Sequence, residues 1–241
     1  MKRTIIAAAL IAGAFMSAHA DYAASDNIYG IINVPIVAGM NAVGVSLLPM
    51  DPAADRLHDV ILPEGLTAGN SSTGDGLWLY GATYDKYYLA AGNVWTNGSV
   101  GPAATLGMGA WIKAAAPATI YQVGIVTNVA TVEIPTAATG HSFIANPFPA
   151  DLVVDGVGAM IDWSETAAWN KNALSGDRLL IWTGTKYDTY YYFNNGNSEI
   201  DGWYSADNKG RRPPTIPAGE GFFFQRKTED ADWVEVQNPL D

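Results

Sequence analysis

Short apolar runs separated by glycine-containing turns recur along the whole chain, and they predict strands. Two of these runs, residues 77–80 and 179–182, each follow a Gly-Asp pair, which is typical of a buried strand that begins after a turn. Tyrosine-rich runs follow at 84–89 and 187–193, and aromatic residues favour strands. A short glycine-containing segment separates the two runs of each pair, and glycine can supply the positive φ of a tight hairpin turn. The pattern therefore predicts one hairpin in each half of the chain.

Further strands are predicted before and after each hairpin. The expected segments are opening hairpins at 34–48 and 132–144, strands that start after a Gly-x-Gly near 111 and 222, and closing strands at 120–126 and 233–236. Helical signal is weak, and only 51–61 and 165–174 are candidates for short helices. Glycine and proline are spread along the chain, as in proteins with many short strands and tight turns. The expected fold class is all-β.

Four sequence blocks recur in the same order in the two halves. They are GVSLLP at 44–49 and GHSFI at 140–144, GDGLWLY at 74–80 and GDRLLIW at 176–182, YDKYY at 84–88 and YDTYY at 187–191, and GMGAWI at 107–112 and GEGFFF at 219–224. Chance similarity in a chain rich in glycine and tyrosine is the alternative, but four blocks in one order favour an internal duplication. We therefore expect two tandem, pseudo-symmetric β modules, sandwiches or small barrels, at 21–128 and 129–241.

The first twenty residues have the features of a signal peptide. Lys2 and Arg3 form a positive start, residues 5–16 are apolar and uncharged, and Ala18-His19-Ala20 is an A-x-A cleavage site. A membrane anchor is the alternative, but the apolar run is shorter than the ~20 residues that span a bilayer. We expect cleavage after Ala20 and a secreted, periplasmic or cell-surface protein of a bacterium that is not membrane-spanning.

Composition and charge exclude several classes of function. The 241 residues are 49% hydrophobic and only 15% charged, which indicates a folded globular chain. The absence of cysteine excludes a disulfide scaffold, a cysteine zinc site, an iron–sulfur centre and a thiol enzyme. A formal charge of −11 argues against a nucleic-acid partner, because an acidic surface repels phosphate.

The sequence offers little catalytic chemistry, so we expect no enzyme activity, no cofactor and no metal. The mature chain has only two histidines, His58 and His141, with no ligand spacing between them, and phosphate-binding glycine motifs are absent. Asp75 and Asp177 occupy matched positions and are candidate glycosidase carboxylates, but an aspartate that closes a turn is the better interpretation. The oxygen-rich segment 194–201 leaves calcium binding open, although its spacing is not that of an EF-hand.

Aromatic side chains are the most suggestive feature of the sequence. Along a strand, Tyr190 and Tyr192 share one face, and Trp203 is expected nearby. With Tyr87 and Trp95 in the first half, these residues are the candidate platform for a carbohydrate, whose C–H faces stack on aromatic rings. The alternative is that this face is covered by the other module or by a loop.

The motifs I-A-N-P at 144–147, W-T-G at 182–184 and G-E-G-F-F at 219–223 form a familiar series. In these motifs the chain resembles a group of uncharacterised secreted bacterial β-repeat proteins. The resemblance covers about 100 residues of the second half and is weaker in the first, where 47–49 and 107–109 depart from it. It implies secretion and β structure, but no known activity and no functional residues.

The function that these observations favour is a secreted or cell-surface, non-catalytic structural or adhesion protein. A carbohydrate-binding module is the alternative, and a glycosidase or lyase comes third. The expected partner is a glycan or another surface protein.

Overall fold

The computed structural model describes residues 28–51, 53, 55–154, 161–162, 176–193, 201–207, 213–227 and 233–237. The regular secondary structure of this part of the chain is almost entirely antiparallel β-sheet, which confirms the expected all-β class. Its single described helix, α2 (Leu57–Val60), is one turn inside the predicted helical segment 51–61. The predicted helix at 165–174 and the signal segment at 1–20 lie outside the described residues.

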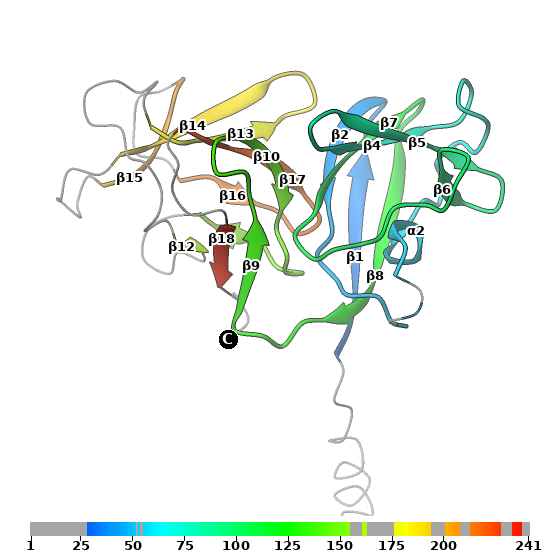
Figure 1. Ribbon diagram of the computed structural model, residues 1–241, viewed down its shortest axis with the longest axis horizontal. Coiled ribbons are helices and arrows are strands. Elements are labelled where there is room, and N and C mark those ends of the chain that lie inside the picture. Colours follow the sequence, from blue (N-terminus) through cyan, green and yellow to red (C-terminus); the bar gives the residue numbers. More distant parts are fainter. Residues whose placement is uncertain are drawn as a thin grey trace, which may run out of the picture.

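The first half of the chain forms two sheets around one core. Its strands are β1 (Ile28–Ile36), β2 (Gly39–Gly44), β3 (Ile61–Leu62), β4 (Gly76–Tyr80), β5 (Tyr84–Ala90), β6 (Val94–Thr96), β7 (Gly109–Ala114) and β8 (Ala118–Val126). They pair as a three-stranded sheet, β1-β8-β3, and a five-stranded sheet, β2-β7-β4-β5-β6 (Figure 1). Buried apolar side chains of both sheets and of α2 meet in this core, among them Leu57, Leu77 and Ile120.

The second half is built in the same way. Its strands are β9 (Thr131–Pro135), β10 (Gly140–Ala145), β11 (Leu152–Val153), β12 (Ile161–Asp162), β13 (Arg178–Trp182), β14 (Tyr187–Phe193), β15 (Gly202–Ser205), β16 (Thr215–Ile216), β17 (Gly221–Arg226) and β18 (Trp233–Gln237). The sheets are β12-β18-β9, β10-β17-β13-β14-β15 and the short pair β11-β16. Phe148, Leu179 and Trp203 are among the side chains of its core.

One strand order is therefore present twice. The five-stranded sheets correspond strand for strand along the chain, and so do β1-β8-β3 and β9-β18-β12. Both predicted hairpins form, as β4–β5 and β13–β14, and both closing strands, β8 and β18, are present. The duplication itself and the module boundaries at 21–128 and 129–241 stay predictions.

Sheet register corrects one of the four repeat blocks. Gly39 and Gly140 begin β2 and β10, pair with the last residues of β7 and β17, and have φ values of 104° and 95°. Gly140 therefore corresponds to Gly39, whereas the sequence comparison matched it with Gly44. Both segments begin with Gly and carry Ser two residues later, and that local likeness misled the alignment.

The predicted opening hairpins do not form. β1 pairs with β8 and β2 pairs with β7, so the chain passes from one sheet to the other between Ile36 and Gly39. Asn41 holds this corner, because its side chain accepts a hydrogen bond from Val37 N and donates one to Val37 O, both at 2.8 Å. The opening hairpin is absent from the second half as well, where β9 pairs with β18 and β10 pairs with β17.

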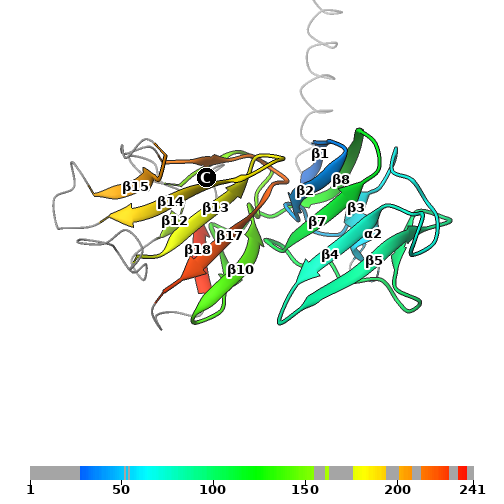
Figure 2. The ribbon, with the colours of Figure 1, turned by 90° about the horizontal axis from the view of Figure 1, so that it is seen from above.

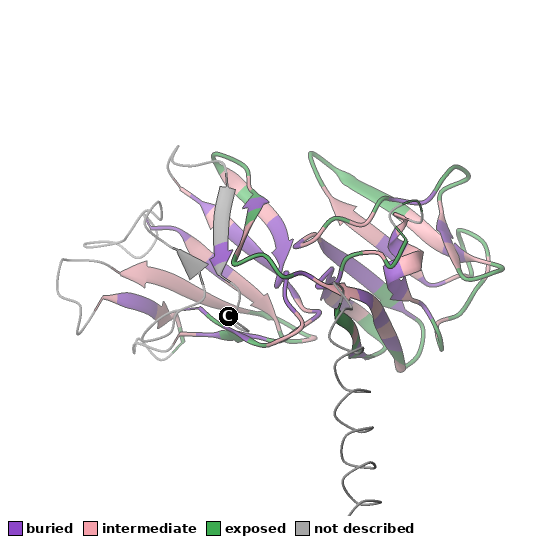
Figure 3. Cartoon of the chain, turned by 90° about the horizontal axis from the view of Figure 1, so that it is seen from below, coloured by how far each residue is buried: buried purple, intermediate pink, exposed green. Residues whose placement is uncertain are grey.

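Two Gly-x-Gly segments mark the place where the halves touch. Gly109 lies against the backbone of β10, where an added Cβ would be 2.9 Å from Ile144 O. Gly221 lies against β2, where an added Cβ would be 2.5 Å from Val43 O. Figure 2 shows β10 and β17 beside the strands of the first half, and buried positions run through the strands at this junction (Figure 3). Only glycine leaves room for such an approach of two backbones.

A buried polar network ties the junction together. Ser46 Oγ donates to Asn146 O at 2.6 Å and accepts from Gly219 N at 3.0 Å. Gln122 accepts from Ser46 N and donates to Gly44 O, at 3.0 and 2.6 Å. Ser46, Gln122 and Asn146 are fully buried, and such satisfied networks fix one arrangement of the packed parts. Ser46 is thus a structural residue.

Candidate ligand-binding site

The five residues of the predicted aromatic platform lie on the inward faces of the five-stranded sheets. Trp95 and Trp203 have no exposed surface, and they are among the largest fully buried side chains. Tyr87 packs against the core of the first half, and Tyr190 and Tyr192 pack against that of the second. The expectation that Tyr190 and Tyr192 face solvent beside Trp203 is therefore corrected: this face of the strand covers the core, and the opposite face points outward.

The outward faces of the two five-stranded sheets carry a second set of aromatic side chains, which meet between the halves. Six residues line a cavity of about 230 Å³ there: Tyr80, Tyr84, His141, Leu180, Tyr187 and Phe223. We call this cavity the aromatic cleft. Two of its residues come from the β4–β5 hairpin and the other four from β10, β13, β14 and β17, so each half contributes.

Beneath the cleft, three buried aromatic residues form a stacked layer. The rings of Phe143 and Phe223 are 4.6 Å apart and nearly parallel, and Trp111 stacks on Phe143 at 5.1 Å. These side chains are only 4–8% exposed, so the layer is a packed floor rather than an open surface. It also explains why β7 and β17 are buried on both faces.

Edge-to-face contacts hold the walls of the cleft. Tyr80 of the first half packs its ring at 90° to Phe223 of the second, with centroids 5.1 Å apart. In the opposite sense, Trp182 of the second half donates a hydrogen bond from Nε1 to Met40 O of the first, at 2.8 Å. Each half therefore places at least one hairpin aromatic residue on the other half, and both walls depend on the junction.

Two tyrosines form the rim. Tyr84 and Tyr187 are the first residues of β5 and β14, and each is 39% exposed. They occupy the same register position in the two hairpins, where Tyr84 pairs with Tyr80 and Tyr187 with Trp182. The repeated YD-x-YY block therefore contained the site, but alternation alone did not show which of its tyrosines face outward.

Burial shifts the pKa values of two groups of the cleft, Tyr187 and His141, in the direction that favours their neutral forms. Burial, together with the neighbouring Tyr84, raises the pKa of Tyr187 to about 12. Burial lowers the pKa of His141 below its ordinary 6.5, and the positive charges of Lys227 and Arg178 lower it further. At neutral pH the cleft thus offers aromatic faces, phenol hydroxyls and a neutral imidazole, which can both donate and accept hydrogen bonds.

The matched aspartates lie away from the cleft. Asp75 accepts backbone hydrogen bonds from Thr67 N at 2.7 Å and Ala115 N at 2.8 Å, and Asp177 accepts one from Lys227 N at 2.7 Å. This supports a structural role. The bond from Thr67 N closes the loop before β4, whereas those from Ala115 N and Lys227 N reach residues just beyond the ends of the neighbouring strands β7 and β17.

Among the described residues, no group of three or more His, Asp or Glu side chains is placed to hold a metal ion. His141 lies in the aromatic cleft, whereas His58 lies on α2 with its Nδ1 near Gly101. Residues 194–200 of the candidate calcium segment are outside the described part of the chain. That part also contains no helix that is both long and apolar enough to cross a membrane.

Comparison with protein-family models, curated proteins and solved structures finds no match to this chain. The candidate site therefore rests on geometry and chemistry alone.

Proposed function

We propose that this chain is an exported, non-catalytic adhesion protein that binds a carbohydrate in the aromatic cleft. The observation that carries the proposal is the pair of half-exposed rim tyrosines, Tyr84 and Tyr187, above a floor of stacked rings. Sugar rings stack their C–H faces on aromatic side chains, and their hydroxyl groups need polar partners. The tyrosine hydroxyls and the neutral His141 are partners of this kind.

The non-catalytic part of the proposal is supported by where the carboxylates lie. Glycosidases place two carboxyl groups about 5 to 9.5 Å apart around the scissile bond. The six residues that line the cleft include no carboxylate, and Asp75 and Asp177 are engaged with backbone N–H groups elsewhere. Binding, rather than hydrolysis, is what the cleft is equipped to do.

Export is proposed on the basis of the signal-like segment at 1–20. It predicts that the mature protein, whether periplasmic, secreted or attached to the cell surface, begins at Asp21. N-terminal sequencing of the protein from the producing cell checks this, and an intact Met1 in the cell envelope would contradict it.

The binding proposal is tested on the mature chain, residues 21–241. A glycan array identifies sugars that bind, and titration calorimetry then measures them on variants. We expect the double variant Tyr84→Ala/Tyr187→Ala to bind at least roughly tenfold more weakly, because truncating a central aromatic anchor typically costs about 1 kcal/mol or more. Tyr29→Ala is the matched control, since Tyr29 is a 61% exposed tyrosine on β1. An array without binders, or a double variant that binds like the control, would overturn the proposal.

A structural role through self-association is the second candidate. β1 is the edge of its sheet, and Ile28, Tyr29 and Ile31 on it are 61–71% exposed. An edge strand with exposed apolar side chains can pair with another copy. Sedimentation at increasing concentration would then show dimers that Tyr29→Ala and Ile31→Lys weaken, whereas monomers at all concentrations would exclude this role.

A further inference from the structure

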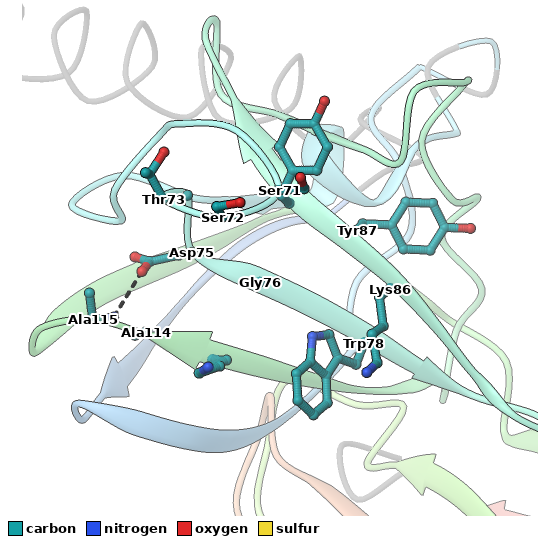
Figure 4. Close-up of a pocket in the computed structure, with 13 residues that line it drawn as sticks. Ser71, Ser72, Thr73, Asp75, Gly76, Trp78, Lys86, Tyr87, Ala114 and Ala115 are labelled. Carbon is teal, nitrogen blue, oxygen red and sulfur yellow. Dashed lines mark hydrogen bonds between the residues drawn. The ribbon is translucent and has the colours of Figure 1, made fainter.

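A second cavity opens on the outward face of the first five-stranded sheet. Its volume is about 340 Å³, and its walls come from β4, β5, β7 and the loop before β4 (Figure 4). The side chains that matter here are Trp78, Lys86, Tyr88 and Lys113, together with the hydroxyl residues 71–73. We call it the Gly76 pocket, because Gly76 lies at its centre.

The pocket exists because position 76 has no side chain. Gly76 pairs with Tyr88 on one side and Lys113 on the other, and an added Cβ would be 3.1 Å from Trp78 Nε1. In the second half the same register position is Arg178, which pairs with Tyr191 and Gln225. The Arg178 guanidinium lies 5.3 Å from the centre of the Tyr191 ring. The second half thus has a large cation at the position that the first half leaves open.

The solvent-facing charge of the Gly76 pocket is positive, although the chain carries −11 overall. Lys86 and Lys113 are both exposed, and neither forms an ion pair with the part of the chain that the structure describes. Lys86 Nζ lies 4.7 Å from the centre of the Trp78 ring. The only carboxylate in the lining, that of Asp75, is 4% exposed and directs both oxygens to backbone N–H groups.

Trp78 links this pocket to the aromatic cleft. Its ring centre is 6.1 Å from that of Tyr84, one of the two rim tyrosines. A chain of sugars that stacks on Tyr84 can therefore continue past Trp78 and reach the two lysines. The pocket combines aromatic walls, hydroxyl groups and two cations, which suits a saccharide that carries a negative charge.

We propose that the Gly76 pocket is an anion-accepting subsite, and that the glycan bound by this protein is acidic, with a carboxylate or sulfate ester group held between Lys86 and Lys113. This inference rests on the proposed carbohydrate binding and specifies its ligand. In the described part of the second half Arg178 takes the place of Gly76, so we place the acidic residue at the end of the site that the first half forms.

The test compares three sets of oligosaccharides by titration calorimetry on the mature chain: oligogalacturonate, its methyl-esterified neutral form and a sulfated galactan. We expect an acidic ligand to bind at least roughly tenfold more tightly than the neutral one. Its affinity should fall as the salt concentration rises, since the contacts are between exposed charges. Tighter binding of oligogalacturonate would indicate recognition of a carboxylate, and tighter binding of the sulfated galactan would indicate recognition of a sulfate ester.

Lys86→Gln/Lys113→Gln should remove this preference and leave neutral binding unchanged. Gly76→Leu, which fills the pocket without adding a charge, should do the same, and circular dichroism checks that both variants fold. Lys186→Gln is the matched control, because Lys186 is an exposed lysine of the other half, paired with Asp207 at 3.1 Å.

The two proposals fail in different ways. If neutral glycans bind through Tyr84 and Tyr187 with no preference for acidic ones, or if the lysine variants keep the preference, the anionic subsite is wrong and the cleft stands. If no glycan of any kind binds, both are wrong.

Discussion

Single side chains decide how strand ends are held in this protein. Asp75 and Asp177 lie directly before β4 and β13, and each fastens the neighbouring strand of its sheet through a backbone N–H. Sequence comparison found both residues through their matched position, and it favoured a structural role. It could not give the hydrogen-bond partners, because Ala115 is 40 residues from Asp75 in the chain.

At this scale, Asp75→Ala should lower the free energy of unfolding by about 2–6 kcal/mol, because it leaves two backbone donors without an acceptor and each costs about 1–3 kcal/mol. Asp75→Asn keeps one acceptor oxygen and should cost less. Asp85→Ala, at an exposed position of β5, is the control and should stay within about 0.5 kcal/mol. Urea denaturation measures all three, and equal stabilities of the Asp75 and Asp85 variants would contradict the role assigned to the carboxylate.

Among the elements, the hairpins were predictable and the sheet partners were not. Apolar runs, glycine turns and tyrosine-rich runs are local signals, and they located β4–β5 and β13–β14. The partner of β1 is β8, at the other end of the half, and no local pattern reports such a pairing. β14 carries aromatic residues on both faces, so the alternation of apolar and polar residues could not indicate which face of the strand packs against the core.

The orientation of β14 predicts different costs for two adjacent tyrosines. Tyr190→Ala should destabilise the protein by about 2–3 kcal/mol, somewhat below the ~3 to 5 kcal/mol of a fully buried aromatic residue, since Tyr190 packs against the core but is partly exposed. Tyr191→Ala should cost about 1 kcal/mol or less, chiefly the loss of its contact with Arg178. Thermal and urea unfolding compare the two, and a larger loss for Tyr191 would reverse the assignment of faces.

For the molecule as a whole, the junction of the two halves determines the site. The glycines that let the backbones approach and the Ser46–Gln122–Asn146 network set how the five-stranded sheets face each other. Composition and repeats predicted two similar halves, but the contact between them depends on close packing that no periodicity encodes. For this reason the sequence did not predict the aromatic cleft, although its repeated tyrosines were recognised.

Glu220 makes this junction sensitive to pH. It lies between Gly219 and Gly221, and burial, with a smaller contribution from Asp151, raises its pKa from 4.5 to about 7. Between these pH values the carboxyl of Glu220 is protonated in the folded state and ionised in the unfolded state. The contribution of the protonated carboxyl to the free energy of unfolding is therefore fully present below pH 4.5 and is lost as the pH rises through 7. The shift corresponds to at most about 3 kcal/mol, and solvent screening of the partly exposed side chain reduces it.

Glu220→Gln removes the titration and isolates this effect from that of the other carboxylates. Urea denaturation of both proteins at pH 5 and pH 8 should show that the wild type loses about 1–3 kcal/mol relative to the variant over this range. A difference between the two proteins that stays constant with pH would show that Glu220 is not the responsible group.

Nuclear magnetic resonance of the mature chain with ¹³C-labelled tyrosine rings, titrated with the tightest-binding glycan, tests most directly whether both halves form one carbohydrate site. Tyr→Phe substitutions assign the signals. The geometry predicts that Tyr84 and Tyr187 shift together and saturate at one ligand concentration, whereas Tyr29 on β1 does not respond. Shifts confined to one half, or to tyrosines outside the cleft, would contradict a shared site between the two sheets.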